Sequence, residues 1–183
     1  IVFSKTNKKP FASKVTHNGE VILDTETGWS IKYEDEAFPV LSWKDDNVFT
    51  SISGEFVFHQ NEKEIKEDIS IEELSLQNNW QLSFNEGWNT PKTLEFSELK
   101  CLTTHENEAV KHYSGTVTYS KTINLDEIGK HIILDLGDVA NIAELSCNGK
   151  KVGVKWAPPS EFDISEFVQK GKNTFEIKVT NTW

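Results

Sequence analysis

The sequence predicts an all-β protein with antiparallel strands and a sandwich-like architecture. Residues 113–183 form a series of short strand-like segments, each joined to the next by a Gly or Pro signal. Apolar and polar residues alternate along these segments, as expected for half-buried β-strands. The sequence shows no apolar period of about 3.6 residues sustained over about ten residues, which an amphipathic helix would require. These observations favour the β class.

The first 72 residues carry their own strand signals. Asn18-Gly19 lies between residues 12–16 and 20–24, and Asn-Gly accepts the positive φ angles of a type I′ turn, so we predict a hairpin there. Alternation in residues 29–33 predicts a further strand. A second hairpin is expected across residues 54–69, whose many charged side chains we interpret as a solvated strand face and turn.

We expect a domain boundary in residues 70–78, directly after this charged segment. Domains most often contain about 100–150 residues, so a chain of 183 residues fits two small β units better than one. We assign residues 1–72 to a small β-region and residues 73–183 to a β-sandwich.

The second part begins with a strand and a turn. Trp80, Leu82 and Phe84 alternate with polar residues, and residues 86–91 contain the Gly, Asn and Pro that end a strand. Residues 92–102 follow a less regular pattern, from which we predict no element.

Further strands follow from residue 115 onward. Asn148-Gly149 predicts a further hairpin. Residues 165–168 have the length of a single helical turn. Pro158-Pro159 must lie in a loop or at an edge, because proline has no amide hydrogen to donate. The residues expected to point into the core are Trp80, Phe84, Val117, Tyr119, Ile123, Leu125, Ala143, Leu145, Cys147, Phe175, Ile177 and Val179.

The composition argues against nucleic acid as a partner. The chain has a formal net charge of -10, and all 19 of its basic residues are Lys. Binding to phosphates requires clustered cations, and Arg supplies the bidentate fork that grips them. An acidic, solvated surface is compatible with a neutral ligand such as a sugar.

Apolar runs such as residues 132–134 are far shorter than the ~20 residues of a membrane helix, so we expect no membrane span. The chain begins with Ile1 and strand-like sequence rather than a signal peptide, and we interpret it as the interior of a longer protein.

Cys101 and Cys147 lie in apolar segments and are expected to be two buried thiols, with a disulfide as the alternative.

An ordered set of short motifs resembles a known module of glycoside hydrolases. The motifs are Trp80-x-Leu-x-Phe84, Tyr113-Ser-Gly-Thr-x-x-Tyr119, Leu134-Asp-Leu-Gly137, Ala143-Glu-Leu-x-x-Asn-Gly-Lys150, Trp156-x-Pro-Pro159, Asp163-Ile164, Gly171-x-Asn-Thr174 and the terminal Val179-Thr-Asn-Thr-Trp183. Over roughly residues 74–183 they resemble the C-terminal galactose-binding-like, sugar-binding domain of glycoside hydrolases, most closely that of α-L-rhamnosidase-type enzymes.

The resemblance implies a jelly-roll β-sandwich that acts as a non-catalytic accessory module of an enzyme cleaving plant-type or complex polysaccharides. It implies a catalytic domain of the same polypeptide as partner, outside this chain, with residues 1–72 as the link. The fold often holds a structural calcium ion, but the sequence has no EF-hand-like ligand run, so we assign no cofactor and no metal-binding residue. A periplasmic, cell-surface or secreted location is also implied.

We nominate no catalytic residue. Glycoside hydrolysis usually needs two carboxyl groups flanking the scissile bond. The close pairs Glu34 with Glu36 and Glu106 with Glu108 lie in polar runs that are typical of solvated loops, without an apolar pocket to shift a pKa.

Sugar recognition would need an exposed aromatic face and polar partners for the hydroxyl groups. Trp156 is the first candidate, since Pro158-Pro159 forces a loop beside it and Glu161 lies within reach. Its alternative role is to plug the end of the sandwich or to pack on a neighbouring domain. Trp88, in a turn, is the second candidate, and His112 with Tyr113 the third.

Three functional hypotheses follow. The first is the accessory module of a rhamnosidase-like glycoside hydrolase. The second is an autonomous carbohydrate-binding module, and the third is an adhesion or scaffold β-sandwich without a sugar ligand.

Overall fold

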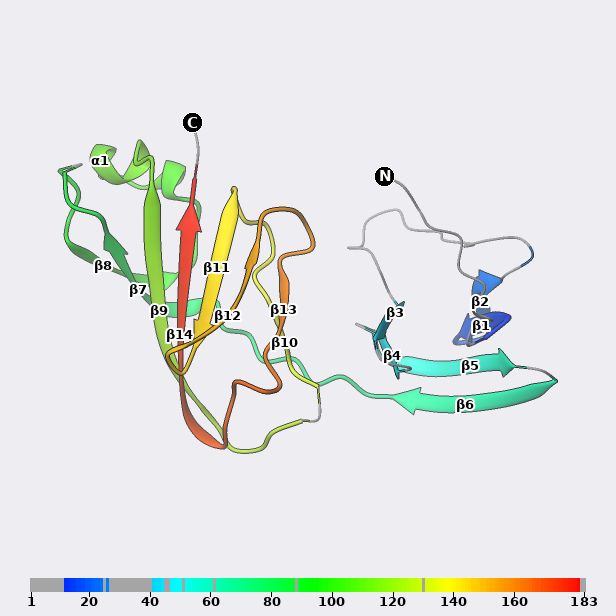
Figure 1. Ribbon diagram of the computed structural model, residues 1–183. Coiled ribbons are helices and arrows are strands. Elements are labelled where there is room, and N and C mark those ends of the chain that lie inside the picture. Colours follow the sequence, from blue (N-terminus) through cyan, green and yellow to red (C-terminus); the bar gives the residue numbers. More distant parts are fainter. Residues whose placement is uncertain are drawn as a thin grey trace. The chain divides into compact units, whose positions relative to one another are not determined.

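The architecture is all-β, as predicted. A computed structural model of the chain describes residues 12–24, 26, 41–44, 47–50, 52–60, 62–87, 89–129 and 131–181. All strand pairs in this part of the chain are antiparallel (Figure 1). The chain divides into two compact units, Ile1–Leu74 and Ser75–Trp183, which we describe separately.

The first unit contains a four-stranded sheet with the order β2-β1-β5-β6 and a separate pair, β3 with β4. The strands are β1 (Lys14–His17), β2 (Glu20–Asp24), β3 (Leu41–Lys44), β4 (Asn47–Thr50), β5 (Gly54–Gln60) and β6 (Lys63–Ile69). Both predicted hairpins are confirmed, and Asn18 and Gly19 have the positive φ angles, 48° and 83°, that the first turn requires. The charged strand β6 is exposed along nearly its whole length, as expected. The strand expected at residues 29–33 lies outside the described residues.

The second unit is built on a six-stranded sheet with the order β12-β11-β14-β9-β7-β8, accompanied by the two-stranded pair β10 and β13. Its strands are β7 (Asn78–Phe84), β8 (Thr93–Glu98), β9 (Thr116–Leu125), β10 (Ile133–Asp135), β11 (Ile142–Cys147), β12 (Lys150–Lys155), β13 (Glu161–Asp163) and β14 (Gly171–Thr180).

The core of the second unit lies on one face of the large sheet, where the small pair β10–β13 contributes Leu134 and Phe162. The inward positions expected from the alternation belong to this core, either buried or packed against it, except Leu125, which is half-buried and is not part of it. This arrangement confirms the predicted β-sandwich. Cys147 is a buried free thiol, but the expectation of burial was wrong for Cys101, which is exposed and free beside Thr103.

Some elements were not foreseen from the sequence. The irregular residues 92–102 contain β8, and a short 3₁₀ helix, η1 (Leu102–Thr104), and one helical turn, α1 (Glu108–Lys111), follow it. Asn107 caps α1, because its side chain accepts hydrogen bonds from the amides of Ala109 and Val110 at 2.9 and 3.4 Å. Helices of three and four residues are the longest in the described part of the chain, and none could cross a bilayer.

Asn173, a fully buried polar residue, ties together two turns of the second unit. Its side-chain oxygen accepts hydrogen bonds from the Gln169 amide at 2.8 Å and from the Asn148 side chain at 2.9 Å. Its side-chain nitrogen donates to the carbonyl groups of Gln169 and Gly171 at 2.6 and 2.9 Å. The β11–β12 turn is thereby fixed to the segment that leads into β14.

Candidate functional site

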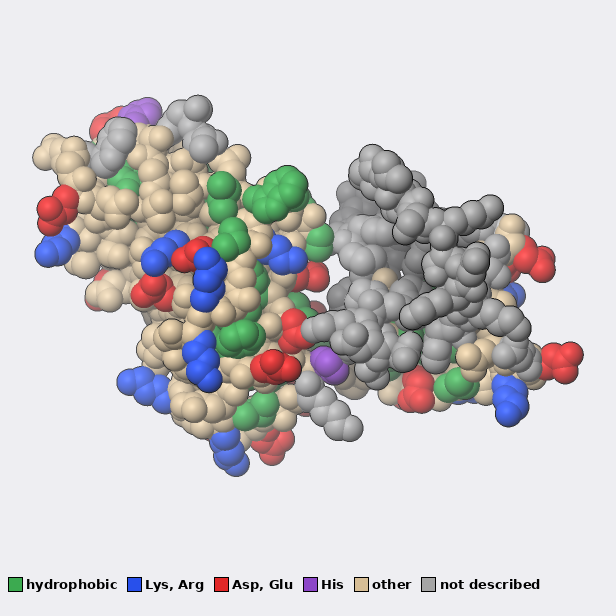
Figure 2. Space-filling view, viewed as in Figure 1, with side chains coloured by type: hydrophobic (Ala, Val, Ile, Leu, Met, Phe, Trp, Pro, Cys, Tyr) green, Lys and Arg blue, Asp and Glu red, His purple; other side chains and the backbone are tan. Residues whose placement is uncertain are grey.

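Trp156 is the most exposed large hydrophobic residue of the described chain, with 78% of its surface accessible. It directly follows β12, the edge strand of the six-stranded sheet, and precedes the loop with Pro158-Pro159. This exposure does not fit the alternative in which Trp156 plugs the end of the sandwich, and it is compatible with contact to a sugar or to a neighbouring domain. Val154 and Ile142 are also exposed, and Figure 2 shows hydrophobic side chains gathered over this end of β11 and β12.

The strand register indicates that the side chains of Trp156 and Lys155 lie on opposite faces of the sheet. Residues paired across an antiparallel ladder point to the same face, and neighbours along a strand point to opposite faces. Lys155 pairs with the buried Ala143, and its ammonium group lies 6.0 Å from the centre of the Phe162 ring. Val154, in contrast, pairs with Glu144 on the outer face of the sheet.

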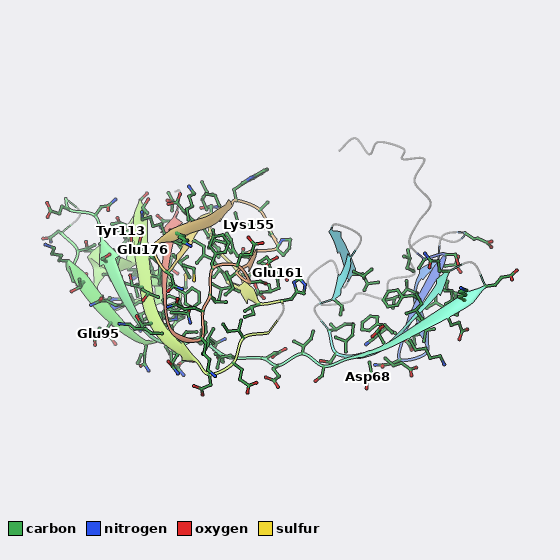
Figure 3. The ribbon with its side chains drawn as sticks, turned by 60° about the horizontal axis from the view of Figure 1, so that its bottom comes forward. Asp68, Glu95, Tyr113, Lys155, Glu161 and Glu176 are labelled. Carbon is green, nitrogen blue, oxygen red and sulfur yellow. The ribbon has the colours of Figure 1, made fainter. Side chains whose placement is uncertain are left out.

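Glu161 begins β13 and lies directly across the ladder from Asp135 of β10. Partial burial raises the pKa of Glu161, the Asp135 carboxylate raises it further, and Lys155 opposes the shift. Figure 3 shows Lys155 and Glu161 on neighbouring parts of the fold. The sequence did not single out Asp135 or Lys155, because their proximity to Glu161 becomes evident only once the pairing of β10 with β13 is known.

A row of ion pairs crosses the outer face of the sheet next to Val154. Glu144 lies 2.5 Å from the ammonium group of Lys151 and 4.0 Å from that of Lys178, and Lys178 lies 3.6 Å from Glu176. The hydrogen bond from Lys151 lowers the pKa of Glu144. The row contains two positive and two negative groups and carries no net charge.

Tyr113 does not lie at a ligand-accessible surface. Only 1% of it is exposed, and its ring packs edge-on against Phe84 with the ring centres 5.1 Å apart. Its hydroxyl donates to the carbonyl of Thr116 at 3.0 Å. Asn181 donates to the carbonyl of Tyr113 at 2.7 Å and accepts from the amide of Gly115 at 2.7 Å. The expectation that Tyr113 contacts a sugar was therefore wrong, since the ring is used to anchor the loop before β9.

His112 is exposed at the end of α1, with its Nε2 atom 3.1 Å from a carboxylate oxygen of Glu108. Figure 3 shows Tyr113, the next residue, well separated from Lys155 and Glu161. The structure thus places Trp156 and Glu161 in one region and His112 in another.

The remaining candidates lie partly outside the described residues. Trp88, Glu34 and Glu36 lie outside the described residues. Glu108 is exposed and bound to Lys111, which lowers the pKa of the Glu108 carboxyl group. Within the described residues, His, Cys, Asp and Glu side chains form no group of three or more that could hold a metal ion.

Comparison with known proteins places these features in a family context. A family described as glycosyl hydrolases family 2, sugar binding domain, matches residues 49–183. The match confirms the resemblance to a sugar-binding domain of glycoside hydrolases and begins earlier than the motifs do, so that it includes β5 and β6.

Two relatives are similar in sequence. A protein named putative beta-glucuronidase from Formosa agariphila is 35% identical over 176 residues, which are 93% of this chain and 14% of the relative. A rhamnosidase structure from Novosphingobium sp. PP1Y is 34% identical with a TM-score of 0.55 and covers 70% of this chain and 13% of its own. The chain therefore spans about one seventh of the length of these proteins.

A more distant structure supports the fold alone. The β-glucuronidase from Ruminococcus gnavus, solved in complex with D-glucuronic acid, has a TM-score of 0.51 at 21% identity. The alignment covers 59% of this chain and 21% of the glucuronidase.

Proposed function

The chain belongs to the sugar binding domains of glycosyl hydrolases family 2, and from this premise we propose that it is a non-catalytic accessory module of a larger glycoside hydrolase. The module packs against the catalytic domain of the same polypeptide and shapes or supports its substrate cleft. The parent enzyme resembles rhamnosidases and β-glucuronidases and acts on plant-type or complex polysaccharides.

One observation carries this proposal. The similarity to the putative beta-glucuronidase covers 93% of this chain but only 14% of the relative, so the chain corresponds to a small part of a much longer protein. A domain of this size, with its core filled by strand side chains, contributes surfaces and loops to such a protein.

The proposal is tested by assaying the isolated chain with chromogenic β-glucuronide and α-rhamnoside substrates. We expect no hydrolysis above the rate in buffer, while the full-length enzyme hydrolyses one of them. The cross-strand carboxyl pair Asp135 and Glu161 provides the sharpest control, because glycosidases act through paired carboxyl groups. Hydrolysis by the chain that is lost in Asp135→Asn or Glu161→Gln would refute the non-catalytic role.

A second candidate function is carbohydrate binding by the module itself, favoured by the 78% exposure of Trp156. An exposed indole can stack on the apolar face of a sugar ring, with Glu161 as acceptor for a hydroxyl group. Calorimetric titration with rhamnose- and galactose-containing oligosaccharides tests this function. Binding should be lost in Trp156→Ala and retained in Leu74→Ala, which removes another exposed apolar side chain; absence of heat at millimolar sugar rules the function out.

A further inference from the structure

We propose that Ile142, Val154 and Trp156 form a docking surface for another domain of the same polypeptide. We call these three residues the β11–β12 patch. The inference rests on the proposed function and deepens it, because it names the surface through which the module contacts the rest of the enzyme.

The patch is formed by the backbone register at one end of the large sheet. Ile142 pairs with Thr180, and Val154 pairs with Glu144, so both side chains point to the outer face, away from the core. Their exposed fractions are 37% and 44%. Trp156 follows two positions after Val154, and Figure 2 shows hydrophobic side chains together on this side.

The patch differs from the rest of the outer face. The positions that continue the face across β14, β9 and β7 are polar: Thr180, Lys178, Glu176, Thr116, Thr118, Ser120, Gln81 and Ser83. A strand face exposed to water is expected to be polar throughout. Three apolar side chains gathered at one end, including a mostly exposed indole, indicate a surface that is covered in the complete protein.

The neighbours of the indole favour a protein over a sugar as the occupant. A sugar needs hydrogen-bonding groups beside the aromatic ring for its hydroxyl groups. Ile142 and Val154 offer none, and Glu144, which lies across from Val154, is already bound to Lys151. Glu161 lies on β13, across from Asp135. Lys155, which has such a group, pairs with the inward Ala143 and lies over the Phe162 ring.

The border of the patch also suits a protein interface. The adjoining row of Lys151, Glu144, Lys178 and Glu176 is paired internally and has no net charge. Stable protein interfaces typically place aromatic and aliphatic side chains at the centre and polar groups at the rim.

The length of the relatives favours a domain of the same polypeptide as the occupant of the patch. The chain covers 14% of the putative beta-glucuronidase and 13% of the rhamnosidase, so most of each such protein lies outside the part that this chain represents. A domain of the same polypeptide is present at high effective concentration and needs only a modest surface for docking. A neighbouring domain is therefore favoured over a second copy of the chain.

Oxidative footprinting of the Trp156 indole tests the proposal in the full-length enzyme and in the isolated chain. We expect oxidation about tenfold slower in the full-length enzyme, because the indole is covered there. Val154→Ser should reduce this protection and lower the melting temperature of the full-length enzyme by more than that of the isolated chain. Ile128→Ser is the matched control, since Ile128 is a similarly exposed apolar residue outside the patch.

Equal oxidation rates in the two proteins would overturn the proposal. It would also be overturned if the isolated chain were protected in a concentration-dependent way, which indicates self-association, or by added oligosaccharide, which indicates a sugar site. None of these results bears on catalysis, whereas hydrolysis by the isolated chain would refute the proposed function itself. The two failures are thus distinguishable.

Discussion

At the scale of single residues, Asn173 shows how this β-sandwich uses a buried polar side chain. The residue has no exposed surface, and both polar atoms of its side chain are hydrogen-bonded. A buried amide is tolerated only when its donors and acceptor are satisfied. The motif Gly171-x-Asn-Thr174, which contributed to the family resemblance, is therefore explained by folding rather than by ligand binding.

We predict that Asn173→Ala lowers the free energy of unfolding by about 3 kcal/mol, because the amide of Gln169 loses the side-chain oxygen that accepts its hydrogen bond and the side chain of Asn148 loses one of its hydrogen bonds. Asn124→Ala is the control, since Asn124 is exposed, and it should change stability by less than about 0.5 kcal/mol. Urea denaturation followed by fluorescence measures both. Equal effects of the two substitutions would contradict the structural role of Asn173.

Tyr119 gives a prediction for the pH dependence of stability. Burial, with a smaller effect of Cys101, raises the pKa of Tyr119 to about 12 from 10.0. The folded protein therefore retains the phenolic proton between pH 10 and about 12, whereas the unfolded chain releases it. The free energy of unfolding therefore falls as the pH rises through this interval. The contribution of Tyr119 to this fall is at most about 2.7 kcal/mol.

The measurement compares the unfolding free energies of the wild type and Tyr119→Phe from pH 8 upward. The difference between them should be constant below about pH 10 and change above it, since Phe cannot ionise. A constant difference up to pH 12 would show that Tyr119 titrates normally in the folded state.

At the scale of strands and turns, alternation and turn chemistry predicted most elements. Asn18-Gly19 and Asn148-Gly149 both close hairpins, because Asn and Gly adopt the positive φ angles that such turns require. Strand β8 was missed because it is an edge strand with little buried surface and therefore a weak pattern. The turn α1 was missed because four residues cannot establish a helical period.

The end of β14 is fastened by Asn181, which bridges the carbonyl of Tyr113 and the amide of Gly115 at 2.7 Å each. We predict that Asn181→Ala lowers the unfolding free energy by about 2 kcal/mol, since both backbone groups lose a partner in a partly buried site. Thr122→Ala, on an exposed position of β9, should cost less than about 0.5 kcal/mol. Thermal denaturation distinguishes the two variants. An unchanged melting temperature for Asn181→Ala would argue against a stabilising role of the two Asn181 hydrogen bonds.

At the scale of the whole molecule, the candidate site was less predictable than the fold. The adjacent prolines predicted a loop beside Trp156 but not whether the indole is exposed, and its neighbours could be named only from the register of β11 and β12. Tyr113 was misjudged because sequence alone does not reveal whether a tyrosine near a loop points inward. The carboxyl pair of Asp135 and Glu161 is separated by 26 positions in sequence and is joined by a strand pairing without a local signal.

The division into two units predicts the outcome of limited proteolysis. Residues 70–77 have no regular structure, Glu72, Glu73 and Leu74 are exposed, and this segment spans the boundary between the two units. A Glu-specific protease should therefore cut first after Glu72 or Glu73, because cleavage requires locally extended backbone. The released fragment should begin at residue 73 or 74.

This fragment contains all eight strands of the second unit and its complete core, so we expect it to keep a cooperative unfolding transition. Circular dichroism during heating measures this. The matched control is the double variant Glu72→Gln, Glu73→Gln, in which cutting in this segment should be slowed while the rest of the digestion pattern is retained. First cleavage within a strand of the second unit, or a fragment that unfolds without cooperativity, would show that the second unit depends on residues 1–72 for its stability.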